Sequence, residues 1–358
     1  MNALSTKAPK PDASGDRPSA RPAVRQLSVD EDAGAGQRLD NFLLRHCRGV
    51  PKSHLYRLIR SGQVRVNGGR CRPDDRLEPG DVVRVPPVSV AEAPLASAPA
   101  PAVEFPVLHE DAVLLAVDKP AGVAVHGGSG VAHGVIEQLR AARPQAVFLE
   151  LAHRLDRETS GVLLLGKKRR ALLDLHAQLR ERRTDKRYLA IVVGRWPLRT
   201  KTVQFALHRY LTPEGERRVR VQDGGQAALT RVTGLRQFEL PGLGVFTLVE
   251  AKIETGRTHQ IRVHLAHSGF PIAGDDKYGS FELNRALQRA GHRRMYLHAH
   301  SISIRHPDDG RPLRLVAPVP EAFDRLVAAG RPVVRAPAST GGDEAPDAAP
   351  VGEAGGER

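Results

Sequence analysis

Short apolar blocks separated by polar turns run through most of this chain. The block 162–165 is too short for a helix and predicts a buried strand, and the segments 112–117 and 186–194 predict two more strands. The apolar segment 245–253 and the alternating segment 301–305 predict two further strands. Helical spacing, with apolar residues three and four positions apart, predicts helices at 38–46, 51–62, 172–179, 259–267 and 323–327.

One polar turn stands out because it leads directly into a wholly apolar strand. Asp156 lies in the charged segment 153–159, just before the block 162–165. A loop fixed by a core strand and open on one side suits a reactive carboxylate. An aspartate that pairs with Arg154 or Arg157, or that caps a turn, would give the same local pattern. The loop alone therefore leaves both interpretations open.

The N-terminal part of the chain predicts a compact basic module. Two predicted helices are followed by a strand, an Asn67-Gly68 turn and the strand 82–85, a helix–helix–hairpin order. Residues 36–87 contain eleven Lys and Arg against five Asp and Glu. The polar side of the second helix carries Lys52, Arg57 and Arg60. These side chains are candidate contacts for RNA phosphates, and a solvated charged face is the alternative.

Composition narrows the class of partner. The 358 residues carry a formal net charge of +14, which favours a polyanion such as nucleic acid, although a basic soluble protein would look the same. Two cysteines cannot complete a zinc site or form a disulfide scaffold. No apolar run approaches the roughly 20 residues of a membrane span, and the N-terminus lacks a secretory signal. We therefore expect a cytoplasmic protein with no membrane partner.

Low-complexity segments set the predicted domain boundaries. Residues 1–22 and 333–358 are rich in Pro, Ala, Gly and charge and predict disordered tails. The Pro- and Ala-rich segment 88–103 predicts a semi-rigid linker. Two folded parts remain, the basic module at 23–87 and a larger domain at 104–332.

Two resemblances follow from these motifs. The basic module, with Gly-Gln-Val-Arg-Val-Asn-Gly at 62–68, resembles the S4 RNA-binding domain. The larger domain contains four motifs in order: Asp-Lys-Pro-Ala-Gly at 118–122, His-Arg-Leu-Asp-Arg-Glu-Thr-Ser-Gly at 153–161, Lys-Arg-Tyr at 186–188 and Gly-Arg-Thr-His-Gln-Ile-Arg-Val-His at 256–264. With these motifs it resembles the RluA family of pseudouridine synthases. The S4-like module before it narrows the resemblance to members that act on the ribosomal large subunit.

The resemblance implies an α+β fold, in which a small S4-type domain precedes a catalytic domain built on a mixed, mainly antiparallel sheet with flanking helices. It implies an enzyme that isomerises uridine to pseudouridine in 23S rRNA without a metal or an organic cofactor. The implied partner is 23S rRNA or the assembling large subunit, and we expect a monomer.

The resemblance also assigns roles to individual residues. Asp156 matches the catalytic carboxylate, which glycosidic bond cleavage requires near the sugar, and Arg262 matches the arginine that pairs with it. Tyr188 matches the tyrosine that stacks beside the target uracil. Arg154 matches an arginine that enters the space left by the flipped base, and Ile261 matches an apolar residue of the base pocket.

Three alternatives share parts of this pattern. A non-catalytic RNA-binding factor would have the same S4-like module and charge. A related synthase would act on other rRNA or tRNA uridines. A nucleoside hydrolase would release the free base.

Overall fold

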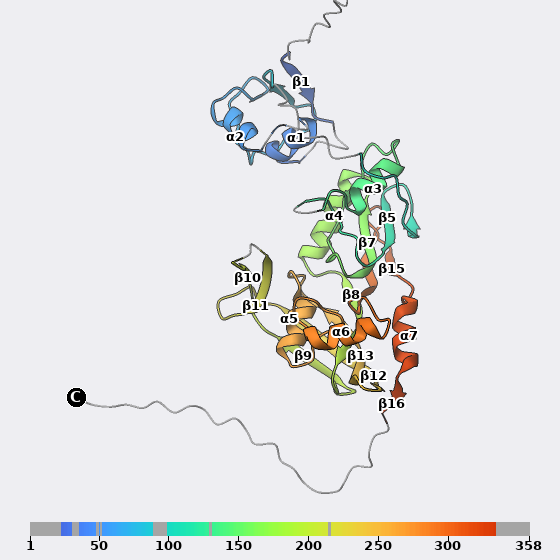
Figure 1. The fold of residues 1–358 in the computed structure, drawn as a ribbon. Coiled ribbons are helices and arrows are strands. Elements are labelled where there is room, and N and C mark those ends of the chain that lie inside the picture. The colour runs from blue at the N-terminus through green and yellow to red at the C-terminus, as the bar shows by residue number, and fades with distance from the viewer. Residues whose placement is uncertain are drawn as a thin grey trace, which may run out of the picture. The chain divides into compact units, whose positions relative to one another are not determined.

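The computed structural model describes residues 23–30, 36–47, 50, 52–88, 99–128, 131–213 and 216–333 (Figure 1). Outside these residues lie the predicted N-terminal tail, the predicted C-terminal tail beyond Val333 and most of the predicted linker. Within the described part, every helix is too short or too polar to cross a lipid bilayer. Contacts divide the chain into two compact units. The first comprises the chain up to Arg187 together with His298–Pro318, and the second comprises Tyr188–Leu297 and the chain from Val319 onward.

The basic N-terminal module folds in the predicted order. Its elements are β1 (Arg25–Ser28), α1 (Leu39–His46), α2 (Lys52–Arg60), β2 (Arg65–Val66) and β3 (Val82–Val85). The strands form a sheet in the order β1-β3-β2, and the two helices pack through buried leucines and Phe42. The predicted Asn67-Gly68 turn is present, since both residues have positive φ angles.

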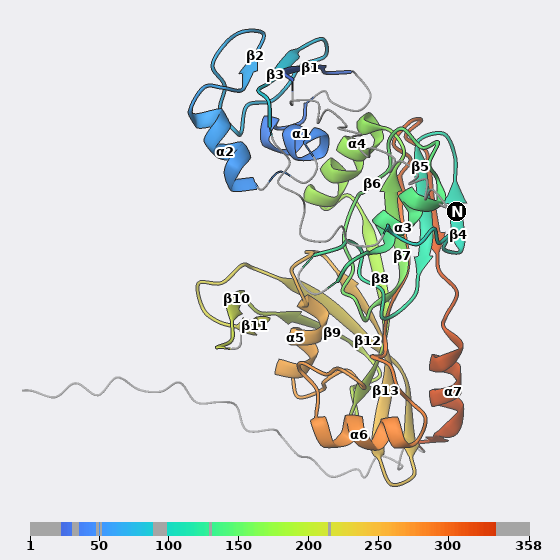
Figure 2. The ribbon, with the colours of Figure 1, turned by 45° about the horizontal axis from the view of Figure 1, so that its top comes forward.

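The remainder of the first unit is a mixed sheet with helices. Strands β4 (Val107–Glu110), β5 (Leu114–Lys119), β7 (Ser160–Gly166) and β14 (Leu297–Arg305) are neighbours in that order. β14 runs parallel to β7, whereas β4–β5 and β5–β7 are antiparallel. Every residue of β7 is buried, as its apolar sequence predicts. The peripheral elements are β6 (Glu150–Leu151), β15 (Pro312–Val316), α3 (Val135–Ala142) and α4 (Arg169–Arg180), of which α4 packs against β7 (Figure 2).

The second unit contains a larger antiparallel group of strands. Strands β8 (Asp185–Val193), β13 (Gly244–Ile253), β12 (Leu229–Leu240) and β16 (Arg331–Pro332) are neighbours in that order, and β9 (Thr200–Gln204) also pairs with β12. A separate hairpin consists of β10 (Leu207–Leu211) and β11 (Arg217–Val221). The helices are α5 (Gln260–His267), α6 (Phe281–Arg289) and α7 (Glu321–Ala329). Helix α5 contacts both β11 and β12 and lies beside the hairpin in Figure 2.

The last long strand begins earlier than the sequence predicts. The prediction began at Ser301, but β14 begins at Leu297. The strand includes these earlier residues because they pair with β7, in the register His298 to Ser160 and Ala299 to Gly161. His298 is fully buried, and its Nδ1 is hydrogen bonded to Ser160 Oγ at 2.9 Å, which offsets the cost of burying a polar ring.

Gly161 is required where these two strands meet. Its φ angle is +112°, and a Cβ atom built on it would lie 2.2 Å from the carbonyl oxygen of Ala299. Because that neighbour is backbone within a sheet, it cannot move aside cheaply. The glycine therefore permits the close approach of β14 to the strand that follows the Asp156 loop.

We predict that Gly161→Ala lowers the free energy of unfolding by roughly 2–5 kcal/mol, through backbone strain and overpacking together. Denaturant unfolding measures this loss. The matched control is Gly310→Ala, where φ is +72° but no atom lies within 4 Å of the new Cβ. That variant should lose only about 1–2 kcal/mol, from the left-handed backbone alone. Equal losses in both variants would contradict the steric explanation.

Candidate functional site

The Asp156 loop lies between β6 and β7 in the first unit. Asp156 is half-buried, Leu155 is buried beneath the loop, and Arg154 is exposed. The Thr159 N–H donates to the Asp156 carbonyl at 3.1 Å and closes a turn. Arg157 forms its ion pair with Glu158 at 2.8 Å. The loop thus presents a carboxylate and an exposed guanidinium two residues apart.

The buried side chain of Lys119 anchors this loop. Lys119 has no exposed surface, so its ammonium group must find acceptors within the protein. Its Nζ donates to three main-chain carbonyls, those of Pro120 at 2.8 Å, Val123 at 2.7 Å and Arg157 at 3.0 Å. The Gly122 N–H donates to the same Arg157 carbonyl at 2.9 Å. The Asp-Lys-Pro-Ala-Gly turn therefore anchors the residue directly after Asp156.

His153 supports the loop as a neutral ring. The N–H of Leu164, in β7, donates to His153 Nε2 at 3.1 Å. Desolvation by burial is the main reason that the pKa of His153 falls to about 4. The ring therefore stays unprotonated at neutral pH and accepts this bond.

This pKa predicts acid sensitivity of the fold. A histidine has a pKa of about 6.5 when unfolded, so the unfolded chain takes up the proton first as the pH falls. The stabilisation is fully present above pH 6.5 and is lost progressively towards pH 4, by roughly 2–3 kcal/mol.

We predict that His153→Gln removes this part of the pH dependence, measured by denaturant unfolding at pH 7 and pH 4.5. His208→Gln, on the exposed face of β10, should keep the wild-type dependence. Parallel stability curves for wild type and His153→Gln would contradict the assignment.

In the second unit, a hydrogen-bond network orients α5. The helix follows His259, whose φ of 52° is left-handed, and Gln260 at its first position is buried. The Gln260 side chain makes four hydrogen bonds, accepting from Thr255 Oγ1 at 2.7 Å and the Arg257 N–H at 3.1 Å and donating to the Leu229 carbonyl at 3.0 Å and Thr230 Oγ1 at 2.9 Å. Much of the Gly-Arg-Thr-His-Gln motif therefore serves to fix the start of the helix.

Arg262 in α5 has a partner that the sequence did not suggest. Its side chain is only 3% exposed, and its guanidinium meets the fully buried carboxylate of Asp275 side-on. Nε donates to Oδ2 at 2.8 Å and Nη2 donates to Oδ1 at 2.7 Å. The resemblance had instead paired Arg262 with Asp156. That pairing joins residues of different units and stays a prediction.

The remaining predicted residues of the second unit lie in or beside its core. Ile261 is 5% exposed and belongs to the buried cluster of this unit. Tyr188 in β8 is half-buried and packs against that same cluster. Core packing is therefore one reason for the residue type at both positions, Ile261 and Tyr188.

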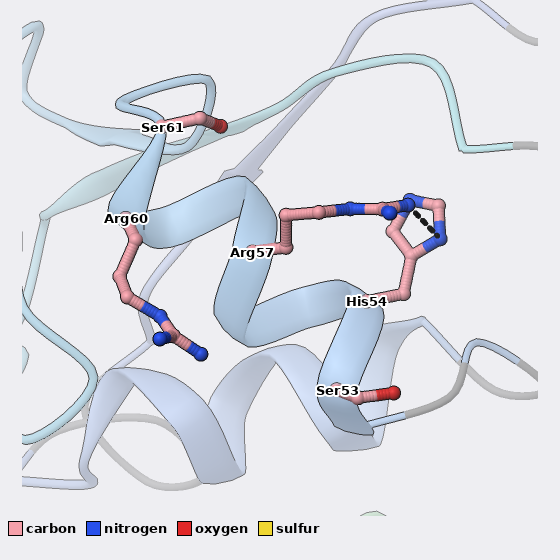
Figure 3. A pocket seen from close by; sticks show the side chains of 5 residues that line it. All are labelled: Ser53, His54, Arg57, Arg60 and Ser61. Atoms are coloured by element: carbon pink, nitrogen blue, oxygen red, sulfur yellow. Dashed lines mark hydrogen bonds between the residues drawn. The ribbon is translucent and has the colours of Figure 1, made fainter.

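The predicted RNA contacts of the N-terminal module lie on α2. Arg57 and Arg60 are exposed and line a hollow of about 800 Å³ with Ser53, His54 and Ser61 (Figure 3). Arg57 Nη2 lies 3.4 Å from His54 Nδ1. Lys52 begins the helix, and its side chain is outside the described part. This open basic hollow suits a phosphate group of nucleic acid.

Among the described residues, His109, Asp111 and His306 are grouped as a metal site would require. Both imidazole Nε2 atoms lie 2.8 Å from Asp111 Oδ2, and the carboxylate also accepts two backbone N–H groups. Desolvation raises the pKa of Asp111, but these hydrogen bonds outweigh it and hold the pKa well below its usual range. Since each ligand atom has a hydrogen-bond partner, the cluster is explained as a clamp at the β4–β5 turn, and we assign no metal to it.

Comparison with known proteins identifies the class of protein to which this chain belongs. A family model described as RNA pseudouridylate synthase matches residues 113–267, and the S4 domain model matches residues 37–83. The chain belongs to the RNA pseudouridine synthases and carries an N-terminal S4 domain.

Individual relatives are similar over nearly their whole length. The chain is 50% identical over 303 residues to the ribosomal large subunit pseudouridine synthase C of Yersinia pestis, which covers 83% of this chain and 93% of the relative. It is 48% identical over 314 residues to the protein of that name from Escherichia coli K12, covering 86% and 96%. Among solved structures, human RNA pseudouridylate synthase domain containing 1 matches with a TM-score of 0.54 and 26% identity over 67% of this chain and 93% of that one.

Proposed function

We propose that this protein isomerises specific uridines of 23S rRNA to pseudouridine. The observation that carries the proposal is the near-full-length similarity to enzymes named ribosomal large subunit pseudouridine synthase C, together with an Asp156 loop that is anchored by Lys119. The substrate is 23S rRNA, free or within an assembling large subunit, and the enzyme acts as a cytoplasmic monomer.

The reaction breaks the N1–C1′ bond of the target uridine and forms a C5–C1′ bond. The C5 proton leaves and N1 gains a proton, so atoms balance without a co-reactant. In the proposed site, Asp156 acts as the carboxylate beside the sugar, and Arg262 is the arginine that pairs with it. Tyr188 stacks beside the uracil and assists removal of the C5 proton. The exposed Arg154 fills the space left when the base is flipped, and Ile261 lines the base pocket.

The S4 domain positions the RNA in this proposal. Lys52, Arg57 and Arg60 contact phosphates, which gives affinity and register without base choice. Part of the site selection then comes from RNA shape.

We predict that Asp156→Asn abolishes product formation, with a fall of at least about 1,000-fold in rate, while rRNA binding persists. Tritium release from rRNA labelled at uridine C5 measures the rate. The control is Glu158→Gln, two residues away. Glu158 forms an ion pair with Arg157, and this variant should form product at a rate near that of the wild type. Substantial product from the Asn variant would overturn the assignment.

Product analysis separates the alternatives. Release of free uracil would identify a hydrolase, and absence of turnover by the wild type would identify a binding factor. Chemical mapping of pseudouridines in cells with and without the gene distinguishes 23S rRNA from other rRNA or tRNA targets.

The S4 contacts predict a salt effect. Replacing Arg57 and Arg60 together by alanine should weaken rRNA binding and reduce the slope of log K against log salt concentration by about 1–2. Arg325→Ala, which removes an exposed cation from α7, is the matched control. An unchanged slope in the double variant would count against phosphate contact by α2.

A further inference from the structure

The loop that follows α5 holds Arg262 by one edge of its guanidinium group. Asp275 occupies the Nε–Nη2 edge with two short hydrogen bonds, and neither side chain is appreciably exposed. Side-on pairing of this kind fixes the plane of the guanidinium as well as its position. Nη1 then projects in a direction that Asp275 determines.

Asp275 is itself held rigidly. Its Oδ1 also accepts the N–H groups of Lys277 at 2.9 Å and Tyr278 at 3.1 Å. Its main-chain carbonyl accepts from the Asn284 side chain at 2.7 Å and from the Gly279 N–H at 3.0 Å. The carboxylate therefore cannot rotate or shift without breaking several buried hydrogen bonds.

Tyr278 restrains the flat face of the same guanidinium. The ring centroid lies 5.1 Å from the central carbon of Arg262, within the range of a cation–π contact. The Tyr278 hydroxyl lies 2.7 Å from His259 Nδ1 and accepts the N–H of Val219 in β11 at 3.0 Å. One edge and one face of Arg262 are thus fixed from outside its own helix.

We infer that Asp275 is a positioning residue for the isomerisation, and that it fixes the orientation of Arg262, the catalytic arginine of the proposed function. This inference rests on the proposed function. A long, flexible catalytic side chain loses efficiency when its geometry varies by about 1 Å. A buried carboxylate clamp removes that freedom before the substrate binds.

The test is Asp275→Asn, which keeps the shape and an acceptor oxygen but removes the charge. The expected result is a fall in kcat of about 10- to 100-fold with KM for rRNA unchanged. Asp276→Asn is the matched control, because this neighbour is 66% exposed, lies 3.5 Å from Arg262 Nη2 and should leave kcat within about twofold of wild type. Wild-type kcat in Asp275→Asn would overturn the inference.

A double-mutant cycle separates positioning from general support of the fold. If Asp275 acts through Arg262, then adding Asp275→Asn to Arg262→Gln should lower kcat no further. Losses that multiply in the double variant would show an independent structural role and overturn the inference.

If Asp275→Asn does not fold, Asp275→Glu decides the matter, since it keeps the charge and moves it by one methylene. A lower kcat at unchanged KM then supports positioning, and wild-type kcat overturns it.

The same assays separate this inference from the function on which it rests. A wild-type protein that forms no pseudouridine would remove the proposed function. An active wild type with an inactive Asp156→Asn and a fully active Asp275→Asn would remove only the role of Asp275.

Discussion

A charge that is taken out of water must be solvated by the protein, and this constraint shapes the surroundings of Asp156 in the first unit and of Arg262 in the second. In the first unit the buried ammonium of Lys119 is surrounded by main-chain carbonyls, one of which belongs to Arg157. In the second unit the buried guanidinium of Arg262 is met by the carboxylate of Asp275. Leaving either cation without its partners would cost several kcal/mol, so the surrounding loops have little freedom to vary. Rigidity at the site is a consequence of burying these cations.

The two cations are satisfied in different ways, and the difference has functional meaning. Main-chain carbonyls accept hydrogen bonds from Lys119, and one of them belongs to Arg157 in the Asp156 loop. The carboxylate of Asp275 instead pairs with the positive charge of Arg262 and fixes the orientation of its guanidinium group. A reaction that cleaves a glycosidic bond benefits from both, because its catalytic groups must be held in one geometry.

The basic charge of the chain has a separate role from the chemistry. Arg57 and Arg60 are exposed on α2 of the S4 domain, where they can exchange counterions for RNA phosphates. Lys119 and Arg262, by contrast, are buried and form hydrogen bonds with other groups of the protein. An enzyme for a large folded RNA can thereby tune affinity on one surface without disturbing the groups that act on the uridine.

Local sequence determined most of the elements of this protein, because their signals act over a few residues. The apolar block of β7, the Asn67-Gly68 turn and the helix α5 all follow from periodicity and turn chemistry. The motifs around Asp156 and Arg262 also identified the family. Only the tertiary structure decided that β14 begins at Leu297 and that Asp275 holds Arg262. Both depend on contacts between segments distant in the chain or on opposite sides of a turn, where burial decides which polar groups must pair.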